Sequence, residues 1–356
     1  MNPIYLDYNA TAPMREAAIA AMTGALRQTG NASSVHRAGR QARRVLEEAR
    51  ETLAEHLGVS PRGVIFTSGG TEANNMALRG LPGRTVLASA VEHPSVLKGP
   101  VDQVIPVDGN GIIDLHALEL HLKGGPALVS VMLANNETGV VQPIDAVVEL
   151  AHRHGALVHV DAVQALGKMR IKTGADLLSF SAHKIGGPQG VGALVLNDPD
   201  LDLKAHCTGG GQEHWHRAGT ENIAGVAGFA AAIKDLGDID SEAARLAGMR
   251  DRIEAALPGI KFGSAVRRLP NTSCLAIPGH SAQTLLMALD LEAVAVSAGS
   301  ACSSGKLSPS GVLLAMGETD LAGSAIRISL GWGTSDDEID QFIERFTRVT
   351  DKLRAA

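Results

Sequence analysis

Short apolar runs alternate with amphipathic stretches through the middle of the chain. The runs are rich in β-branched residues and are bounded by glycines and polar turns, which is typical of buried strands. Strands are predicted over residues 64–67, 85–88, 128–133, 157–160, 177–180 and 191–196. Helical patterns separate several of these runs, for example over residues 145–154. Apolar strands separated by helices predict an α/β fold with a mostly parallel sheet that helices cover on both faces.

The last third of the chain has a different pattern. Strands are predicted over residues 272–277 and 326–330. The closing segment has apolar residues at helical spacing, which predicts an amphipathic helix that carries Ile339, Phe342, Ile343, Phe346, Val349 and Leu353. We therefore expect a second, smaller α+β domain that begins near residue 250.

Composition and charge exclude several classes of function. The 356 residues carry a formal net charge of −6, which gives no basic surface for a nucleic acid or an anionic membrane. No run approaches the roughly 18–20 apolar residues that span a bilayer, and the first residues do not resemble an export signal. The three cysteines are scattered and form no CxxC pair. We therefore expect a cytoplasmic protein with neither a disulfide framework nor a structural metal site.

One lysine and one aspartate give the strongest chemical signal. Lys184 lies between an apolar run and a glycine-rich turn, and Asp161 ends an earlier apolar run. A lysine amine can hold an aldehyde as a Schiff base, and a carboxylate can keep a pyridine nitrogen protonated. The pair in this setting predicts a site for pyridoxal 5′-phosphate (PLP). Each residue alone has a plainer interpretation, because most lysines are solvated surface charges and an aspartate after a strand often caps a helix.

Further polar residues near this pair are candidates for holding the cofactor. The turn at residues 68–71 lies where a predicted strand leads into a helix, so its N–H groups and the Thr71 hydroxyl can meet a phosphate. The alternative is an ordinary turn. Ser181 and His183, just before the lysine, add further donors, and Gln164 is close enough to the aspartate to reach the phenolic oxygen of the ring.

Three residues outside this group have two interpretations each. His93 follows a strand and can stack on the cofactor ring, although a histidine at such a position is more often a structural group. Cys302 lies among small residues and glycines, either as a reactive thiol on an exposed, pliable loop or as an incidental loop cysteine. Arg327 interrupts a predicted strand and is either a clamp for a carboxylate or an exposed arginine on an edge strand.

Taken in this order, these residues resemble the cysteine desulfurases of the class V aminotransferase family. The resemblance extends over nearly the whole chain and is carried by motifs at residues 5–11, 31–36, 68–75, 135–139, 159–164, 209–213, 217–222 and 299–302. The region of Cys302 resembles the branch with an extended mobile cysteine loop. The resemblance implies the aspartate aminotransferase-like fold of PLP-dependent transferases, with a large domain over residues 13–250 and a small domain formed by residues 1–12 and 251–356.

The resemblance also implies a role for each candidate residue. Lys184 forms the Schiff base, and Cys302 takes the sulfur of L-cysteine as a persulfide, which leaves L-alanine. His93 stacks on the ring and is a candidate proton acceptor for the thiol. The other residues that bind the cofactor are Thr71, Asp161, Gln164, Ser181 and His183. The residues that hold the substrate carboxylate are Asn136 and Arg327.

Two implied features involve other molecules. In this family a threonine of the neighbouring subunit also reaches the phosphate, and the matching residue here is Thr220. This implies a homodimer with two shared active sites. The persulfide sulfur then passes to an acceptor, such as an iron–sulfur scaffold protein, or serves tRNA thiolation.

The chain departs from the family pattern at two places. His214, Trp215 and His216 stand where arginine and small residues are usual, and Ala32 stands where proline is common. A His-x-His pair can bind a metal, but no third ligand is near in the sequence, so no metal is expected. A selenocysteine lyase, an aminotransferase acting on a small amino acid and a non-catalytic docking protein remain as alternatives.

Overall fold

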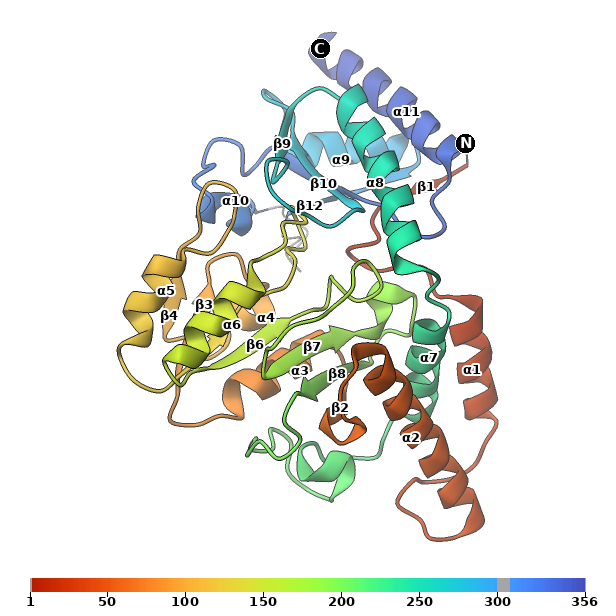
Figure 1. Ribbon diagram of the computed structural model, residues 1–356. Helices are drawn as coiled ribbons and strands as arrows, with labels where there is room; N and C mark the ends of the chain where they lie inside the picture. The colour runs from red at the N-terminus through yellow and green to blue at the C-terminus, as the bar shows by residue number, and fades with distance from the viewer. Residues whose placement is uncertain (1, 300–307, 356) are drawn as a thin grey trace.

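The computed structural model describes residues 2–299 and 308–355, so Cys302 lies outside the described residues. Figure 1 shows two groups of strands, each packed against helices, with both termini beside the smaller group, at opposite ends of α11 (Asp336–Ala355). The larger sheet has the strand order β2-β8-β7-β6-β5-β3-β4. In this order its strands are Val64–Thr67, Gly192–Leu196, Leu177–Ser181, Leu157–Asp161, Ala127–Ser130, Thr85–Ser89 and Gln103–Ile105.

Most neighbouring strands in this sheet are parallel. Only β8 runs antiparallel to its neighbours, β2 and β7, whereas the pairs β7–β6, β6–β5, β5–β3 and β3–β4 are parallel. The predicted α/β fold with a mostly parallel sheet is therefore confirmed. The strand expected over residues 128–133 ends earlier, because β5 stops at Ser130. The chain nevertheless continues beside β6: the N–H groups of Val131 and Leu133 donate to the carbonyls of His159 and Asp161, at 3.0 and 2.9 Å.

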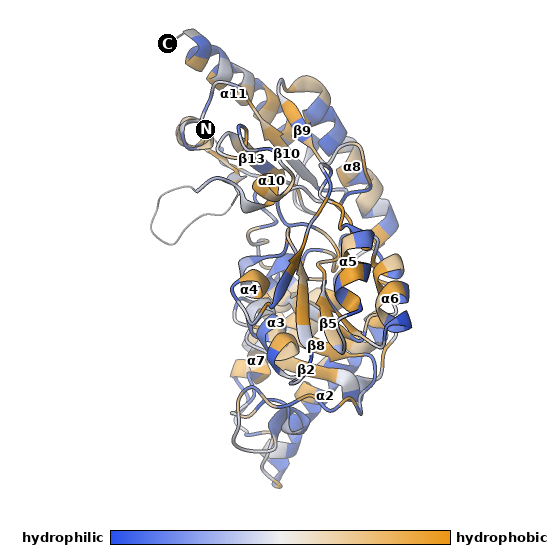
Figure 2. Cartoon of the chain, turned by 90° about the vertical axis from the view of Figure 1, so that its left-hand side faces the viewer, coloured by the Kyte–Doolittle hydropathy of each residue, from blue (hydrophilic) through white to orange (hydrophobic). Residues whose placement is uncertain are grey.

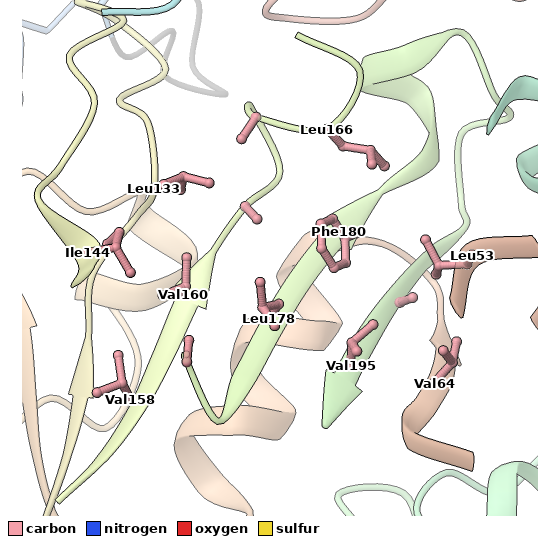
Figure 3. Close-up of a cluster of buried hydrophobic side chains, with 14 of the residues drawn as sticks. Leu53, Val64, Leu133, Ile144, Val158, Val160, Leu166, Leu178, Phe180 and Val195 are labelled. Carbon is pink, nitrogen blue, oxygen red and sulfur yellow. The ribbon is translucent and has the colours of Figure 1, made fainter. Parts of the chain in front are cut away.

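Alternate side chains of the strands belong to different cores. In β2, Val64 and Phe66 pack in one cluster and Ile65 packs in another. The Ile65 cluster contains the apolar residues of α3 (Gly70–Arg79), and the other cluster, shown in Figure 3, contains residues of helices on the opposite face. The helices of this opposite layer are α2 (Arg37–Leu57), α5 (Leu115–Leu122), α6 (Ile144–Arg153) and α7 (Ile223–Lys234). Helices therefore cover both faces of the sheet, as buried parallel strands require.

The smaller sheet is antiparallel, with the order β12-β13-β10-β9. Its strands are Ser297–Ala298, Ala325–Ser329, Thr272–Ala276 and Ile260–Phe262. A short parallel pair, β1 (Ile4–Tyr5) and β11 (Val294–Ala295), lies nearby. The helices of this part are α8 (Ile239–Ala256), α9 (Ala282–Leu291), α10 (Gly311–Ala315) and α11 (Asp336–Ala355).

The first residues of the chain share a core with its C-terminal part. One buried cluster contains Ile4 and Leu6 together with residues from Leu246 to Val349. The predicted division between residues 250 and 251 stays a prediction. The remaining helices, α1 (Glu16–Leu26) and α4 (Pro94–Leu97), belong to the part that contains the larger sheet.

The distribution of hydropathy fits this layered arrangement. In Figure 2 the strands β5 and β8 are coloured mainly hydrophobic, whereas α5 and α6 mix hydrophobic and hydrophilic residues, as helices that cover a sheet do. Within residues 2–299 and 308–355 no helix combines the length and the apolar character needed to cross a membrane.

Candidate active site

A cavity of about 420 Å³ lies at the carboxyl ends of the parallel strands. This is the edge at which open α/β sheets bind ligands, because several strand ends converge there. The predicted site residues that line the cavity are Thr71, His93, Asn136, Asp161, Gln164, Ser181, His183, Lys184 and Arg327. Another side of the cavity is closed by Ala298, which ends β12 of the smaller sheet, and by Gly299, which follows it. The structure therefore brings together residues that are far apart in the sequence.

Lys184 projects from a short 3₁₀ helix, Ala182–Ile185, that follows β7 directly. Its Nζ donates hydrogen bonds to the main-chain carbonyls of Asn9 at 2.6 Å and Ala10 at 2.8 Å. Burial, reinforced by the positive charge of Arg327, lowers the pKa of Lys184 to about 8. A larger share of this amine than of an ordinary lysine is therefore neutral near physiological pH, as a nucleophile or a proton acceptor must be.

Asp161 is the last residue of β6, and only 6% of its surface is exposed. Its Oδ2 accepts a hydrogen bond from Asn74 Nδ2 at 2.8 Å, and its Oδ1 accepts one from the main-chain N–H of Val163 at 3.0 Å. Each carboxylate oxygen can accept more than one hydrogen bond, so acceptor capacity remains for a group in the cavity. The same Val163 contact shows that the carboxylate also orders the turn after the strand.

The turn predicted to hold a phosphate is built by close backbone packing. Gly69 has φ 151°, and α3 begins at Gly70. A Cβ on Gly70 would lie 2.7 Å from Val163 Cγ2, and a Cβ on Gly192 would lie 2.6 Å from Gly69 Cα. Glycine fits both positions without displacing a neighbour. Gly70 and Thr71, at the start of α3, line the cavity together with Ser181, so a helix N-terminus meets the cavity there.

His183 is half-buried, whereas His93 keeps more of its surface exposed, and both line the cavity. His183 Nδ1 lies 3.2 Å from Thr11 Oγ1, and burial together with the charge of Lys184 lowers the pKa of His183 to about 4. His93 Nδ1 lies 2.8 Å from Ser95 Oγ, and burial lowers the pKa of His93 below its ordinary value. Both imidazoles are therefore uncharged at neutral pH.

Arg327 lies on β13, between β12 and β10, with 7% of its side chain exposed. The interpretation as an exposed edge-strand arginine is therefore wrong. Its Nη2 donates to Asp7 Oδ1 at 2.7 Å, and its Nη1 donates to the main-chain carbonyl of Asn136 at 3.0 Å. Its Nε is buried and has no hydrogen-bond partner among the described residues. Such a donor favours an anionic ligand at this end of the cavity.

One predicted residue lies elsewhere. Thr220 is exposed and lines a separate cavity of about 220 Å³, together with Arg217 and Glu221. Cys302 lies outside the described residues, although Gly299, three positions earlier, lines the main cavity.

The residues that depart from the family pattern lie in an unusual backbone segment. Glu213, His214 and Trp215 all have positive φ, at 46°, 53° and 71°, and 73% of Trp215 is exposed. Three consecutive residues in the left-handed region are uncommon when none is glycine. In the part of the chain that the structure describes, no group of three or more side chains forms a metal site.

The residues around the cavity fit the cofactor that the sequence predicted. A lysine of lowered pKa and a buried carboxylate line the same cavity, and a glycine turn at a helix start provides main-chain donors for a phosphate. The buried Oδ1 of Asn74, unpartnered within the described ranges, is a further polar atom beside this cavity that a ligand can satisfy.

Comparison with known proteins places the chain in a family. The family model of class-V aminotransferases matches residues 4–342. A cysteine desulfurase of Cereibacter sphaeroides is 42% identical over 380 residues, which cover all of this chain and 97% of that protein. The cysteine desulfurase IscS of Dictyoglomus turgidum is 39% identical, over 99% of this chain and 95% of that protein. This chain belongs to the cysteine desulfurases of the class V aminotransferase family.

Solved structures agree with this assignment. A NifS-like protein from Rickettsia africae has a TM-score of 0.91 and 34% identity, over 98% of this chain and 100% of that one. The predicted family, fold class and enzyme type are therefore confirmed. The family is one of PLP-dependent enzymes, whereas the role of each site residue stays a prediction.

Sequence reasoning assigned no role to several polar residues in or beside the cavity, among them Asn9, Asn74 and Glu92. Asn9 and Asn74 belong to motifs that were noted, but no role was assigned to them, and both side chains are about 1% exposed. Glu92 is also buried, and its desolvation together with the charge of Asp161 raises its pKa well above the ordinary value. The one feature of the sequence that points to them is that asparagine and glutamate are frequent in the segments directly after the apolar runs.

Proposed function

We propose that this chain is a cysteine desulfurase that uses PLP to convert L-cysteine to L-alanine and transfers the sulfur to Cys302 as a persulfide. The observation that carries the proposal is that Asp161, at the end of β6, and Lys184, just after the neighbouring β7, share one cavity with Arg327 of the smaller sheet. The relatives named cysteine desulfurase support it. So does a structure of SspA in complex with cysteine, which has 28% identity and a TM-score of 0.82 over 92% of this chain and 98% of that one.

The chain offers a group for each part of the cofactor. Asp161 would pair with the pyridine nitrogen, Gln164 would bind the phenolic oxygen and His93 would stack on the ring. When bound, PLP accepts electrons from the α-carbon of an amino acid. The groups proposed to hold its phosphate are the N–H groups at the start of α3, Thr71, Ser181 and His183. Because His183 is uncharged at neutral pH, it would act on the phosphate as a hydrogen-bond donor and not as a cation.

Arg327 and Asn136 would position the substrate. The buried Nε of Arg327 has no partner in the described part of the chain, and a substrate carboxylate bound there would satisfy it. The guanidinium is already held by Asp7 and by the Asn136 carbonyl, so its orientation is fixed before a substrate arrives.

Lys184 and His93 would handle protons. With its pKa lowered to about 8, Lys184 Nζ can take up a proton from the substrate and return it within one turnover. His93 is uncharged at neutral pH and can accept the thiol proton of Cys302. The thiolate would then attack the sulfur of the substrate, so that an S–S bond forms as the C–S bond breaks, and the carbon skeleton gains protons and leaves as L-alanine.

We also propose a cytoplasmic homodimer in which Thr220 contributes to the partner's site, and a protein acceptor such as an iron–sulfur scaffold for the sulfur. The location of Thr220 outside the main cavity of its own chain supports a role in another subunit. A selenocysteine lyase remains the nearest alternative, and it would strongly prefer selenocysteine to cysteine.

The decisive experiment measures alanine and sulfide from L-cysteine under anaerobic conditions with a thiol reductant. We expect equal amounts of both products from the wild type and from Cys207→Ala, which removes an exposed cysteine, and neither product from Cys302→Ala. Full production of both by Cys302→Ala would refute the persulfide step. A wild type that binds PLP but turns over only selenocysteine, or only transaminates, would refute the proposed substrate.

A further inference from the structure

A second lysine lies beside the predicted cofactor site. Lys168 follows the turn after β6, and only 9% of its surface is exposed. Lysine is rarely buried to this degree without a carboxylate partner. Here Nζ donates to two uncharged amide oxygens, Asn9 Oδ1 at 2.7 Å and Gln164 Oε1 at 2.8 Å. Burial, followed by the charges of Lys184 and Arg327, lowers its pKa well below the ordinary value. The fold therefore tolerates a costly group at this position.

The hydrogen bonds of Lys168 fix the orientation of an amide that lines the cavity. A lysine amine that donates to both partners requires an oxygen at each contact. Gln164 must therefore turn its Oε1 toward Lys168, which leaves its Nε2 on the other side of the amide group. One Nε2 hydrogen is donated to the Asn9 carbonyl at 3.0 Å, and the second is available to the cavity that Gln164 lines.

The same contacts connect this amide with Lys184. The main-chain carbonyl of Asn9 accepts hydrogen bonds from both Gln164 Nε2 and Lys184 Nζ. The Asn9 side chain is held by Lys168 at its oxygen and by Thr272 through its Nδ2 at 2.9 Å. A closed set of bonds thus runs through Lys168, Gln164 and Asn9, with Lys184 attached to it.

We propose that Lys168 is a positioning residue of the cofactor site, which orients the Gln164 amide so that it presents an N–H group to the phenolic oxygen of PLP. The inference rests on the proposed function, because it assigns a support to the residue proposed to bind that oxygen. Without Lys168 only the hydrogen bond from Gln164 Nε2 to the Asn9 carbonyl opposes a half-turn of the amide. The turned amide presents its oxygen, which repels the phenolic oxygen instead of binding it.

The test compares two cofactors on the full-length protein freed of bound cofactor. PLP and 3-deoxypyridoxal 5′-phosphate differ only in the phenolic oxygen, so the ratio of their dissociation constants isolates the contact with that oxygen. We expect the wild type to prefer PLP by about 10-fold, which is the value of one good hydrogen bond. Lys168→Met should lower this ratio to near one, as should Gln164→Leu. The double variant should lower it no further.

A matched control separates positioning from general destabilisation. Lys172→Met makes the same change at an exposed lysine four residues later and should keep the wild-type ratio. A general loss of stability would weaken both cofactors equally and leave the ratio unchanged. Thermal unfolding of each variant identifies those that do not fold. If Lys168→Met does not fold, Lys168→Leu, which also has no donor, replaces it with the same loss of preference expected.

The outcomes also separate this inference from the proposed function. A wild type that binds neither cofactor refutes the PLP site itself. A wild type that binds both equally, or a Lys168→Met variant that keeps the preference of the wild type, overturns the positioning role while the desulfurase proposal stands.

Discussion

At the scale of single residues, burial changes what ordinary side chains can do. The amines of Lys184 and Lys168 and the imidazoles of His93 and His183 all have lowered pKa values, and desolvation is the largest cause for each. Such a concentration of perturbed groups around one cavity is typical of active sites. Burial therefore favours the neutral forms of these four side chains in and beside the cavity.

Lys184 predicts a pH dependence for cofactor capture. An ordinary lysine is protonated up to about pH 10, whereas Lys184 should lose its proton near pH 8. In protein freed of cofactor, the rate of PLP capture by Lys184 should rise as the pH increases through 8 and then level off. Stopped-flow absorbance over a pH series measures this rate, with N-acetyl-lysine as the reference. A rate that keeps rising to pH 10, as the reference does, would contradict the lowered pKa.

Replacing the Asp161 carboxylate should reduce turnover while the protein still folds. Asp161→Asn keeps the shape of the side chain and can still accept from the Val163 N–H, but it carries no charge for the pyridine nitrogen. We expect alanine production to fall by about 10²-fold or more, with thermal unfolding close to that of the wild type. Asp290→Asn, at an exposed position of α9, is the control. Activity within a few-fold of the wild type in Asp161→Asn would refute this role.

At the scale of elements, one buried ion pair joins helix α2 to the strained segment near residue 213. Arg50 and Glu213 form two hydrogen bonds, at 2.9 and 3.1 Å, and their side chains are 2% and 3% exposed. Glu213 Oε2 also accepts from the main-chain N–H of Phe66 at 2.8 Å, and Arg50 donates to the carbonyl of Val64. The pair therefore fixes the positive φ of Glu213 by tying its side chain to α2 and β2.

Removing one charge of this pair should be costly. Glu213→Gln leaves the buried Arg50 charge with only the half-exposed Glu47 carboxylate, 3.2 Å from its Nε. We therefore expect a loss of about 3 kcal/mol in the free energy of unfolding, measured by urea denaturation. Arg50→Met combined with Glu213→Gln should lose less than Glu213→Gln alone, because no unpaired charge remains buried. A loss below about 1 kcal/mol in the single variant would show that the pair contributes little.

At the scale of the whole molecule, the site is assembled from distant parts of the chain. The cavity contains ends of several parallel strands, residues of the N-terminal segment such as Asn9, and Arg327 of the second sheet. Thr220 lines a different cavity, which fits the proposed exchange between two subunits. Activity should therefore depend on the association of two chains.

Mixed dimers test this exchange. The mixed dimer combines one Lys184→Ala subunit with one Thr220→Val subunit and is isolated with two different tags. If Thr220 acts on the partner's site, one of its two sites keeps both an intact Lys184 and an intact Thr220. We expect about half of the wild-type activity from this mixed dimer, and far less from either parent homodimer. If Thr220 acts within its own chain, both sites are damaged and the mixed dimer should be as impaired as the parents.

Local pattern predicted the elements well because it reports local constraints. Apolar β-branched runs marked six strands of the large sheet but missed the short strand β4. The run at β5 was placed too long, since its pairing ends at Ser130 while the extended chain continues. The lysine, the aspartate and the glycine turn could be identified because each follows a strand, and parallel strands end at a common edge.

The sequence by itself determined the α/β fold class, the family and the residues whose chemistry suits PLP. Only the tertiary structure decided that Arg327 is buried instead of exposed, that Glu92 is desolvated, and that Asn9 meets Lys168 and Lys184 across more than 150 positions of chain. Local propensity and spacing act over a few residues, whereas burial and hydrogen-bond partners are set by contacts between distant segments. The side chains around the cavity derive their pKa values and their orientation from those contacts.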